Sequence, residues 1–218
     1  MMSTPIKTLL GAALAMAFSA AHALTPVSYD MPNGNGQASG GSFNYWDLKY
    51  NGAGATNVDG APLSGGVGDL TDGIIATDNW FNVENGAGTG PYVGWLNVDP
   101  TITFHFGSTV SFNSFVIHAD DSNGAGGVSS PAGVTLNSVA GTPTIGFLDP
   151  VGSAPTAFNV SGFNFTGSDF SITLHRSNAW VFVSEVEFSA AAVPEPSTYG
   201  LMLAGLGLMG VIAKRRRG

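Results

Sequence analysis

The residues best suited to chemistry in this chain form a short punctuated segment near its end, Pro194–Glu195–Pro196. Each proline fixes φ and lacks a backbone N–H, and the residue before each proline is biased toward extended geometry. Glu195 is therefore presented on a stiff, extended backbone, where a second protein can recognise it. The segment predicts a recognition site for a protein partner.

The residues after this segment change character twice. Residues 199–213 carry no charge and are mostly Leu, Met, Ala and Gly, and residues 214–217 are all basic. Such a run spans about 22 Å as a helix, which is short against a hydrocarbon core of about 30 Å. We expect a short transmembrane helix over 199–213 and a cytoplasmic basic tail over 214–218, since clustered bases favour that side of a membrane.

The three features in this order closely resemble the PEP-CTERM sorting signal of bacteria. The resemblance covers about 26 residues, 193–218. It implies that an exosortase, a membrane protease-transpeptidase, recognises Pro194, Glu195 and Pro196. It further implies release of the protein, or its transfer to the surface, in bacteria that make exopolysaccharide. The alternative is an ordinary single-pass anchor that follows a proline-containing linker.

The beginning of the chain predicts export as well. Lys7 precedes an apolar run over 9–21, and Ala21-His22-Ala23 fits a signal-peptidase site. We expect a signal peptide over 1–23, transient anchoring in the inner membrane by the tail, and then a place at the cell surface or in the extracellular matrix. The chain has no cysteine, which excludes disulfides and thiol chemistry.

The charge of the chain between the two predicted signals limits the classes of partner that it can bind. Residues 24–193 carry 2 basic and 14 acidic side chains, a formal charge near −12. Nucleic acids and anionic lipid headgroups require basic surfaces, so neither is expected as a partner. Divalent cations and neutral sugars are compatible with this charge. The alternative is that the acidic residues only keep an exported domain soluble.

Enzyme motifs are missing from the sequence. It contains no G-x-S-x-G, no H-E-x-x-H and no nucleotide-binding glycine pattern between a strand and a helix. We therefore expect a non-enzymatic protein. A pair of carboxylates for glycoside hydrolysis stays open, because the spacing of such a pair is spatial and not sequential.

The elements that must position any site are short strands. After an irregular lead-in over 24–41, short runs of alternating or apolar residues are bounded by Gly, Pro, Asn and Ser, and no helical periodicity is visible. This pattern predicts an all-β jelly roll or β-sandwich over 42–189, followed by a linker over 190–198. The expected strands are 42–50, 101–106, 112–119, 134–138, 144–148, 157–165, 170–175 and 181–188.

The order of motifs within that domain resembles the galactose-binding-like, discoidin-type jelly roll of coagulation-factor C modules and carbohydrate-binding modules. The resemblance covers about 42–188 and implies that fold. Members bind sugars, lipids, proteins or no known ligand. The motifs are LTDG at 70–73, Trp80, YVGW at 92–95, PTITFHFG at 100–107 and SEVEF at 184–188.

This resemblance implies a structural Ca²⁺ where the Asp-Gly turn meets the last strand. It nominates Asp72 and Glu185 as ligands, with Asp69 and Thr77 as further oxygen donors. Ca²⁺ takes six to eight oxygens, which a loop with carboxylates and carbonyls can supply. The alternatives are an Asx-turn cap for Asp72 before Gly73 and a solvated strand face for Glu185.

Other candidate sites are weaker. The run 120–124 fails as an EF-hand, because Ala132 stands where a bidentate Glu is needed. His118 and Asp120 would share a strand face and could ligate a metal, although such a pair is more typical of a structural contact. Tyr92 lies beside a Gly-Pro loop and is the expected exposed platform for a sugar, whereas Trp80 and Trp95 match core positions.

The combined expectation is an exported, non-enzymatic surface or matrix protein that binds exopolysaccharide weakly. One alternative is a structural or adhesive matrix protein without a small ligand. A second alternative is a hydrolase of extracellular polymers.

Overall fold

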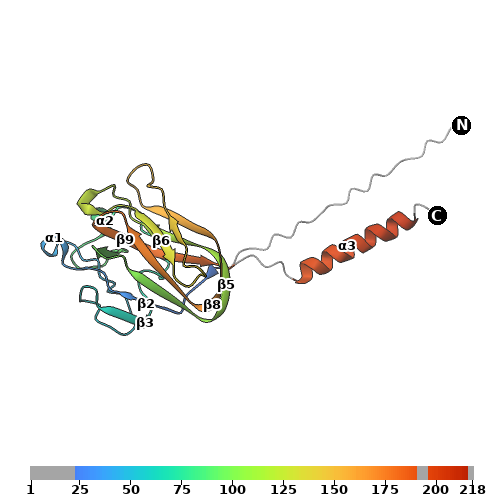
Figure 1. The fold of residues 1–218 in the computed structure, drawn as a ribbon, viewed down its shortest axis with the longest axis horizontal. Coiled ribbons are helices and arrows are strands. Elements are labelled where there is room, and N and C mark those ends of the chain that lie inside the picture. Colours follow the sequence, from blue (N-terminus) through green and yellow to red (C-terminus); the bar gives the residue numbers. More distant parts are fainter. Residues whose placement is uncertain (1–22, 191–195, 216–218) are drawn as a thin grey trace. The chain divides into compact units, whose positions relative to one another are not determined.

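The structure is a computed structural model that describes residues 23–190 and 196–215 (Figure 1). These residues form two units, a β-rich domain and a single helix, and each is described by itself. The predicted signal peptide, apart from Ala23, lies outside the described residues, as do Pro194, Glu195 and residues 216–218.

The regular secondary structure of the domain is almost entirely antiparallel strand, which confirms the predicted all-β sandwich class. Short helical turns interrupt the loops at α1 (Ala38–Gly41), α2 (Trp80–Val83) and η1 (Ala125–Gly127). The strands are β1 (Ala23–Leu24), β2 (Ser28–Pro32), β3 (Pro62–Gly66), β4 (Val93–Leu96), β5 (Thr101–Ala119), β6 (Pro131–Leu136), β7 (Thr144–Gly146), β8 (Thr156–Arg176) and β9 (Trp180–Ser189).

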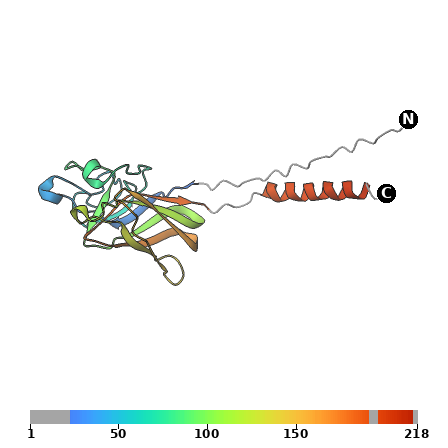
Figure 2. The same cartoon turned by 90° about the horizontal axis from the view of Figure 1, so that it is seen from above.

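The two longest strands, β5 and β8, pair with each other in the middle of the sheet. The order is β1-β9-β5-β8-β6-β7, with β2 beside β5 and β3, and β4 beside β9. Figures 1 and 2 show these strands from two directions. The first part of β5 pairs with β2 and its last part pairs with β9. The pairing of β5 with β8 shifts register between His105 and Val110, around Gly107 at φ 69°. Such a bulge bends a strand, which lets β5 serve both parts of the fold.

The core is a dense cluster of phenylalanine rings from these strands. Phe112 alone packs against five other phenylalanine rings at centroid distances of 5.0 to 6.0 Å. Trp95 is also fully buried and donates from Nε1 to the carbonyl of Pro32 at 2.8 Å, which confirms its predicted core position. Each buried large side chain contributes about 1.5–3 kcal/mol, which supports a fold without disulfides.

The predicted strand over 42–50 is instead an irregular loop with turns. Its polar side chains bind backbone groups within and outside the loop: Asn44 Oδ1 accepts from the N–H of Trp46, and Asp47 Oδ1 accepts from the N–H of Asp69. These bonds replace a strand ladder, while Tyr45 and Tyr50 are buried from within the loop.

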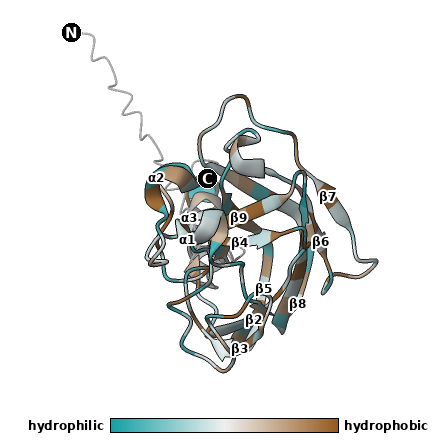
Figure 3. Ribbon diagram, turned by 90° about the vertical axis from the view of Figure 1, so that its left-hand side faces the viewer, coloured by the Kyte–Doolittle hydropathy of each residue, from teal (hydrophilic) through white to brown (hydrophobic). Residues whose placement is uncertain are grey.

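The two ends of β9 distinguish the two ends of the domain. Ala23 in β1 pairs with Ser189 at the end of β9, whereas Leu96 in β4 pairs with Trp180 at its start. Both chain ends of the domain therefore lie together, away from the turns α1 and α2 (Figure 1). We call the region of loops 33–60, 78–92 and 120–130 the loop end; Figure 3 views the domain from this side.

The second unit is α3, Pro196–Arg215. It begins three residues before the predicted helix, since proline is accepted at the first position of a helix, so the last part of the predicted linker over 190–198 is helical. No helix among the described residues combines the length and apolarity needed to cross a membrane, so the predicted transmembrane segment over 199–213 is not confirmed.

Candidate functional site

Three of the four residues predicted to bind calcium lie close together. Asp69 and Asp72 belong to the loop that follows β3, and Glu185 belongs to β9. The loop is tied to this strand by three hydrogen bonds: Val186 N–H to Leu70 O at 2.9 Å, Gly73 N–H to Glu185 Oε2 at 2.9 Å, and Ala76 N–H to Ser184 Oγ at 3.2 Å. The Asp-Gly turn thus meets the last strand, as the sequence predicted.

A lysine side chain lies among these carboxylates. Lys49 Nζ is 2.8 Å from Asp69 Oδ1 and 3.0 Å from Asp72 Oδ2. Asp69 is only 2% exposed, whereas the Lys49 side chain is 43% exposed. Burial lowers the pKa of Lys49, but the hydrogen bonds and charges of the two aspartates outweigh this and raise it to about 12. The ammonium is therefore charged at neutral pH.

A buried layer of polar groups lies beneath this pair. Asp47 is fully buried, accepts from the hydroxyl of Tyr29, and accepts from the N–H of Asp69 at 3.2 Å. Burial, followed by the charge of Asp47, raises the pKa of Asp69 to about 7. Burial likewise raises the pKa of Glu185 to about 7. The site holds more carboxylates than its single ammonium can neutralise.

The remaining details depart from the predicted ligand set. Thr77 is exposed on the loop. Asp72 Oδ1 accepts from the N–H of Ile74 at 2.9 Å, which is the Asx turn offered as its alternative role. Glu185 is 5% exposed and not on a solvated face. Among the residues the structure describes, no three His, Asp or Glu side chains are arranged to hold a metal ion, and calcium binding stays a prediction.

The loop end contains a second, aromatic cluster. Its buried centre is formed by Tyr45 and Phe182, whose ring centroids are 4.5 Å apart, with Trp80 and Trp180 against them. Trp80 is only partly buried, so its predicted core position is met in part.

Tyr92 belongs to this cluster, so its predicted role as an exposed sugar platform is wrong. The residue is 1% exposed, and its hydroxyl donates to the carbonyl of Asp78 at 3.0 Å. The neighbouring Gly-Pro sequence suggested an open loop. Glu84, however, accepts from the N–H of Tyr92 at 2.8 Å and holds the residue under α2.

Two other aromatic side chains at the loop end reach the surface. Phe81 in α2 is 46% exposed. Trp46 is half-buried, and its Nε1–H donates to Asp59 Oδ1 at 2.6 Å. A Cβ on Gly36 would lie 2.2 to 2.5 Å from ring atoms of Trp46, so only glycine lets the backbone pack this closely on the ring. The sequence pattern predicted a strand over 42–50 and favoured Tyr92, and did not single out Trp46.

His118 and Asp120 do not form the metal pair that their spacing suggested. His118 Nε2 lies 2.7 Å from Glu187 Oε2, whereas Asp120 Oδ2 accepts from the N–H of Trp80 at 2.6 Å and so binds the start of α2. Each side chain has its own partner, which matches the structural alternative.

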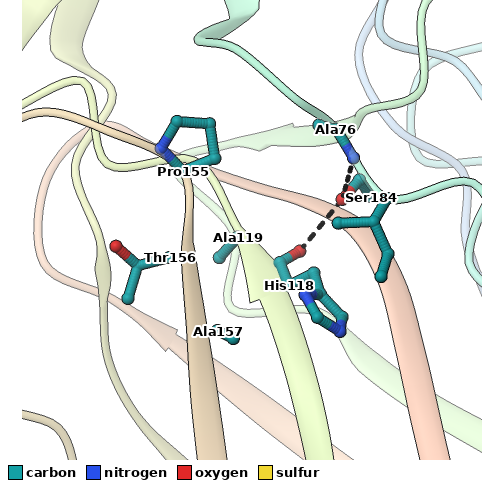
Figure 4. Close-up of a pocket in the computed structure, with 8 residues that line it drawn as sticks. Ala76, His118, Ala119, Pro155, Thr156, Ala157 and Ser184 are labelled. Carbon is teal, nitrogen blue, oxygen red and sulfur yellow. Dashed lines mark hydrogen bonds between the residues drawn. The ribbon is translucent and has the colours of Figure 1, made fainter.

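A small pocket opens beside His118 (Figure 4). Its volume is about 130 Å³, and Ser184 and Thr156 supply its hydroxyl groups. Ser184 Oγ accepts from the N–H of Ala76, as the figure shows, so it is already engaged. The lining contains no Asp or Glu and lacks the two carboxylates of a glycoside hydrolase.

Two family models match the chain. The model for the DS-like domain of discoidin domain-containing receptors 1 and 2 matches residues 26–135. The model for the PEP-CTERM protein-sorting motif matches residues 192–217. A search of curated proteins gave no match.

Several solved structures are similar to parts of the chain. The CBM32 of AlyQ in complex with 4,5-unsaturated mannuronic acid is 20% identical over 44% of this chain and 75% of that chain, at a TM-score of 0.30. The family 32 CBM of C. perfringens NanJ in complex with galactose is 8% identical over 46% and 79%, at 0.32. An F-lectin from Morone saxatilis serum is 12% identical over 78% and 73%, at 0.35. Values this low identify no ligand for this chain.

Proposed function

Because the chain belongs to the DS-like domain family of discoidin domain-containing receptors 1 and 2, we propose that it is a non-enzymatic carbohydrate-binding protein. Its PEP-CTERM motif marks it as an exported protein that is sorted to the cell surface. In this proposal an exosortase processes the precursor, the tail holds the precursor at the inner membrane until then, and the ligand is exopolysaccharide, bound weakly.

The observation that carries this proposal is the rigid mounting of Trp46 at the loop end. An indole offers a flat apolar face to the C–H face of a sugar ring. The contact with Gly36 supports the ring, and the bond to Asp59 fixes its orientation. Since the ring is already held, little side-chain entropy is lost when a ligand binds.

The polar surroundings of Trp46 suit the hydroxyl groups of a sugar. Asp59 Oδ1 accepts from Trp46 and from the N–H of Gly36 at 2.8 Å. Burial raises the pKa of Asp59, but these hydrogen bonds outweigh it and the pKa is lowered, so the carboxylate is ionised at neutral pH. An ionised carboxylate accepts strong hydrogen bonds from hydroxyl donors.

The charge of the domain favours a neutral glycan. A formal charge near −12 over residues 24–193 repels polymers that carry carboxylates or sulfates. We therefore propose a neutral polysaccharide as the ligand class.

The test is a glycan array followed by calorimetric titration of the purified, processed protein. The variants are Trp46→Ala and, as a matched control, Val27→Ala, an exposed apolar residue before β2. We expect Trp46→Ala to weaken binding of a neutral glycan about tenfold or more, as for loss of an aromatic anchor. Val27→Ala should bind like the wild type, and both variants should stay folded.

Two results would overturn the proposal. Equal binding by the wild type and Trp46→Ala would show that the glycan does not bind at Trp46 in the loop end. An array without any bound glycan, together with normal attachment of the protein to cells, would favour the structural or adhesive alternative.

A further inference from the structure

We propose that the ammonium of Lys49 is the resident cation between Asp69 and Asp72, in the place that the sequence assigns to Ca²⁺. The loop after β3 is then closed by the chain's own lysine, and the domain folds independently of calcium. This inference concerns a separate part of the domain from Trp46 and does not rest on glycan binding.

The geometry of the donors carries the proposal. Lys49 Nζ donates a charge-assisted hydrogen bond to Asp72 Oδ2 at 3.0 Å and forms an ion pair with Asp69 Oδ1 at 2.8 Å. Ca²⁺ needs six to eight oxygens at about 2.3–2.6 Å. Among the nominated ligands, Asp72 Oδ1 and Glu185 Oε2 already accept backbone N–H groups. Asp69 Oδ1 and Asp72 Oδ2 contact the ammonium instead, and among the residues that the structure describes no three His, Asp or Glu side chains are arranged to hold a metal ion.

The side chains of Asp47 and Tyr50, on both sides of Lys49, are hydrogen-bonded to neighbouring segments of the fold. Asp47 Oδ1 accepts from the N–H of Asp69, and the hydroxyl of Tyr50 accepts from the N–H of Gly66 at 2.8 Å. The Tyr50 hydroxyl also donates to the carbonyl of Tyr29. These bonds place Lys49 over the carboxylates through its neighbours, so its position does not depend on the ion pair alone.

No other Lys or Arg side chain between residues 24 and 193 is available to replace Lys49 beside these carboxylates. Lys49 and Arg176 are the only Lys or Arg residues between 24 and 193. Arg176 is committed to another place, with Nε 3.2 Å from Asp99 Oδ1. A carboxylate as buried as Asp69 is strongly destabilising when it loses its partner. Without the ammonium, the carboxylates should therefore bind another cation.

The experiment follows thermal unfolding of the full chain in calcium chloride and in EDTA. We expect superimposable curves for the wild type in the two solutions. Lys49→Met keeps the length of the side chain without its charge, and its melting temperature in EDTA should fall by several degrees. Calcium should then raise the melting temperature of Lys49→Met, because the freed carboxylates can bind the added ion.

Three further variants serve as controls. Arg176→Met removes the other cation and should melt near the wild type in both solutions, since its partner Asp99 is exposed. Lys49→Arg keeps the charge and should stay insensitive to calcium. Lys49→Met with Asp69→Asn removes both charges, should recover much of the lost stability, and keeps the test valid if Lys49→Met alone does not fold.

The proposal fails if calcium stabilises the wild type as much as Lys49→Met, because the lysine would then not fill the site. It also fails if Lys49→Met melts like the wild type in EDTA. Failure of glycan binding in the preceding titrations would leave these outcomes unchanged.

Discussion

At the residue scale, Glu84 is a carboxyl group whose surroundings favour its protonated form. Its side chain is 7% exposed, and its Oε1 accepts from the N–H of Tyr92. Burial is the main cause that raises the pKa of Glu84 to about 8, against about 4.3 in an unfolded chain. Between these values the native state binds more protons than the unfolded state, so stability is lost as pH rises.

We predict that the free energy of unfolding decreases by on the order of 2–4 kcal/mol between about pH 5 and 8 through this group. Asp69 and Glu185 act in the same direction, since burial raises both pKa values. Glu84→Gln imitates the protonated carboxyl and should flatten the slope. Chemical denaturation at a series of pH values measures the free energy of unfolding. A stability that rises with pH over this range would contradict the raised pKa of Glu84.

The residues around Asp69 and Tyr92 show which contacts could be predicted from sequence and which could not. Asp69, Asp72 and Glu185 could be brought together from sequence because their motif implies a fold. Lys49 could not be placed among them, since it is 20 positions before Asp69 in a loop without regular structure. Tyr92 was misjudged for a similar reason: Gly90 and Pro91 describe the local backbone, whereas Glu84 and Asp78 decide its burial.

At the element scale, the loop end is joined to β4 through one close approach of backbones. A Cβ on Gly34 would lie 2.0 Å from the carbonyl oxygen of Tyr45 and 2.9 Å from that of Gly94. The same segments exchange hydrogen bonds, Asn35 N–H to Gly94 O at 2.8 Å and Gly94 N–H to Tyr45 O at 3.2 Å. Any side chain at Gly34 must separate them.

We predict that Gly34→Ala lowers the free energy of unfolding by about 3 kcal/mol, as for a forced insertion into a packed region. The matched control is Gly146→Ala in β7, where the nearest atom to a Cβ is 3.9 Å away, and its effect should stay within about 0.5 kcal/mol. Urea unfolding of the full chain measures both. Equal stabilities for the two variants would show that the contact can relax.

Strands whose sequence alternates between apolar and polar residues could be predicted. Strands that form only because a neighbouring strand pairs with them could not. The runs 101–106 and 112–119 are both present, fused into β5 across the bend at Gly107. β3 was missed because its sequence, PLSGG, contains proline and two glycines. β2 is its only partner among the named strands, and a single bridge joins Ser64 to Ala53 on its other side. Pro62 is the first residue of this weakly paired strand, a position where proline is tolerated.

At the scale of the whole molecule, the sorting motif should control the fate of the chain. We predict that Glu195→Ala leaves the precursor unprocessed and membrane-associated, because the extended Pro-Glu-Pro segment is the feature an exosortase would recognise. Ser197→Ala is the neighbouring control and should be processed normally. Immunoblots of membrane and medium fractions measure this, and normal release of the Glu195→Ala protein would refute recognition through the glutamate.

The sorting motif could be recognised from sequence because it is a local pattern of charge, apolarity and proline. The domain class could also be recognised, since turn-bounded short strands carry no competing helical period. The arrangement of the loops, and therefore which aromatic side chains reach the surface, depends on contacts such as Gly36 against Trp46. Those contacts have no local signature.

The position of β9 has a mechanical consequence. Any tension applied through the C-terminal tail enters the domain at Ser189, at the end of a strand that runs to the loop end at Trp180. The neighbouring β5 and β4 pair with β9 along this path. A pull along the strand, against a polymer held at the loop end, loads these cross-strand hydrogen bonds in shear, so that they must break together and not one after another. If the protein is held through its C-terminal tail while the loop end binds a polymer, as proposed above, tension would act along this strand direction.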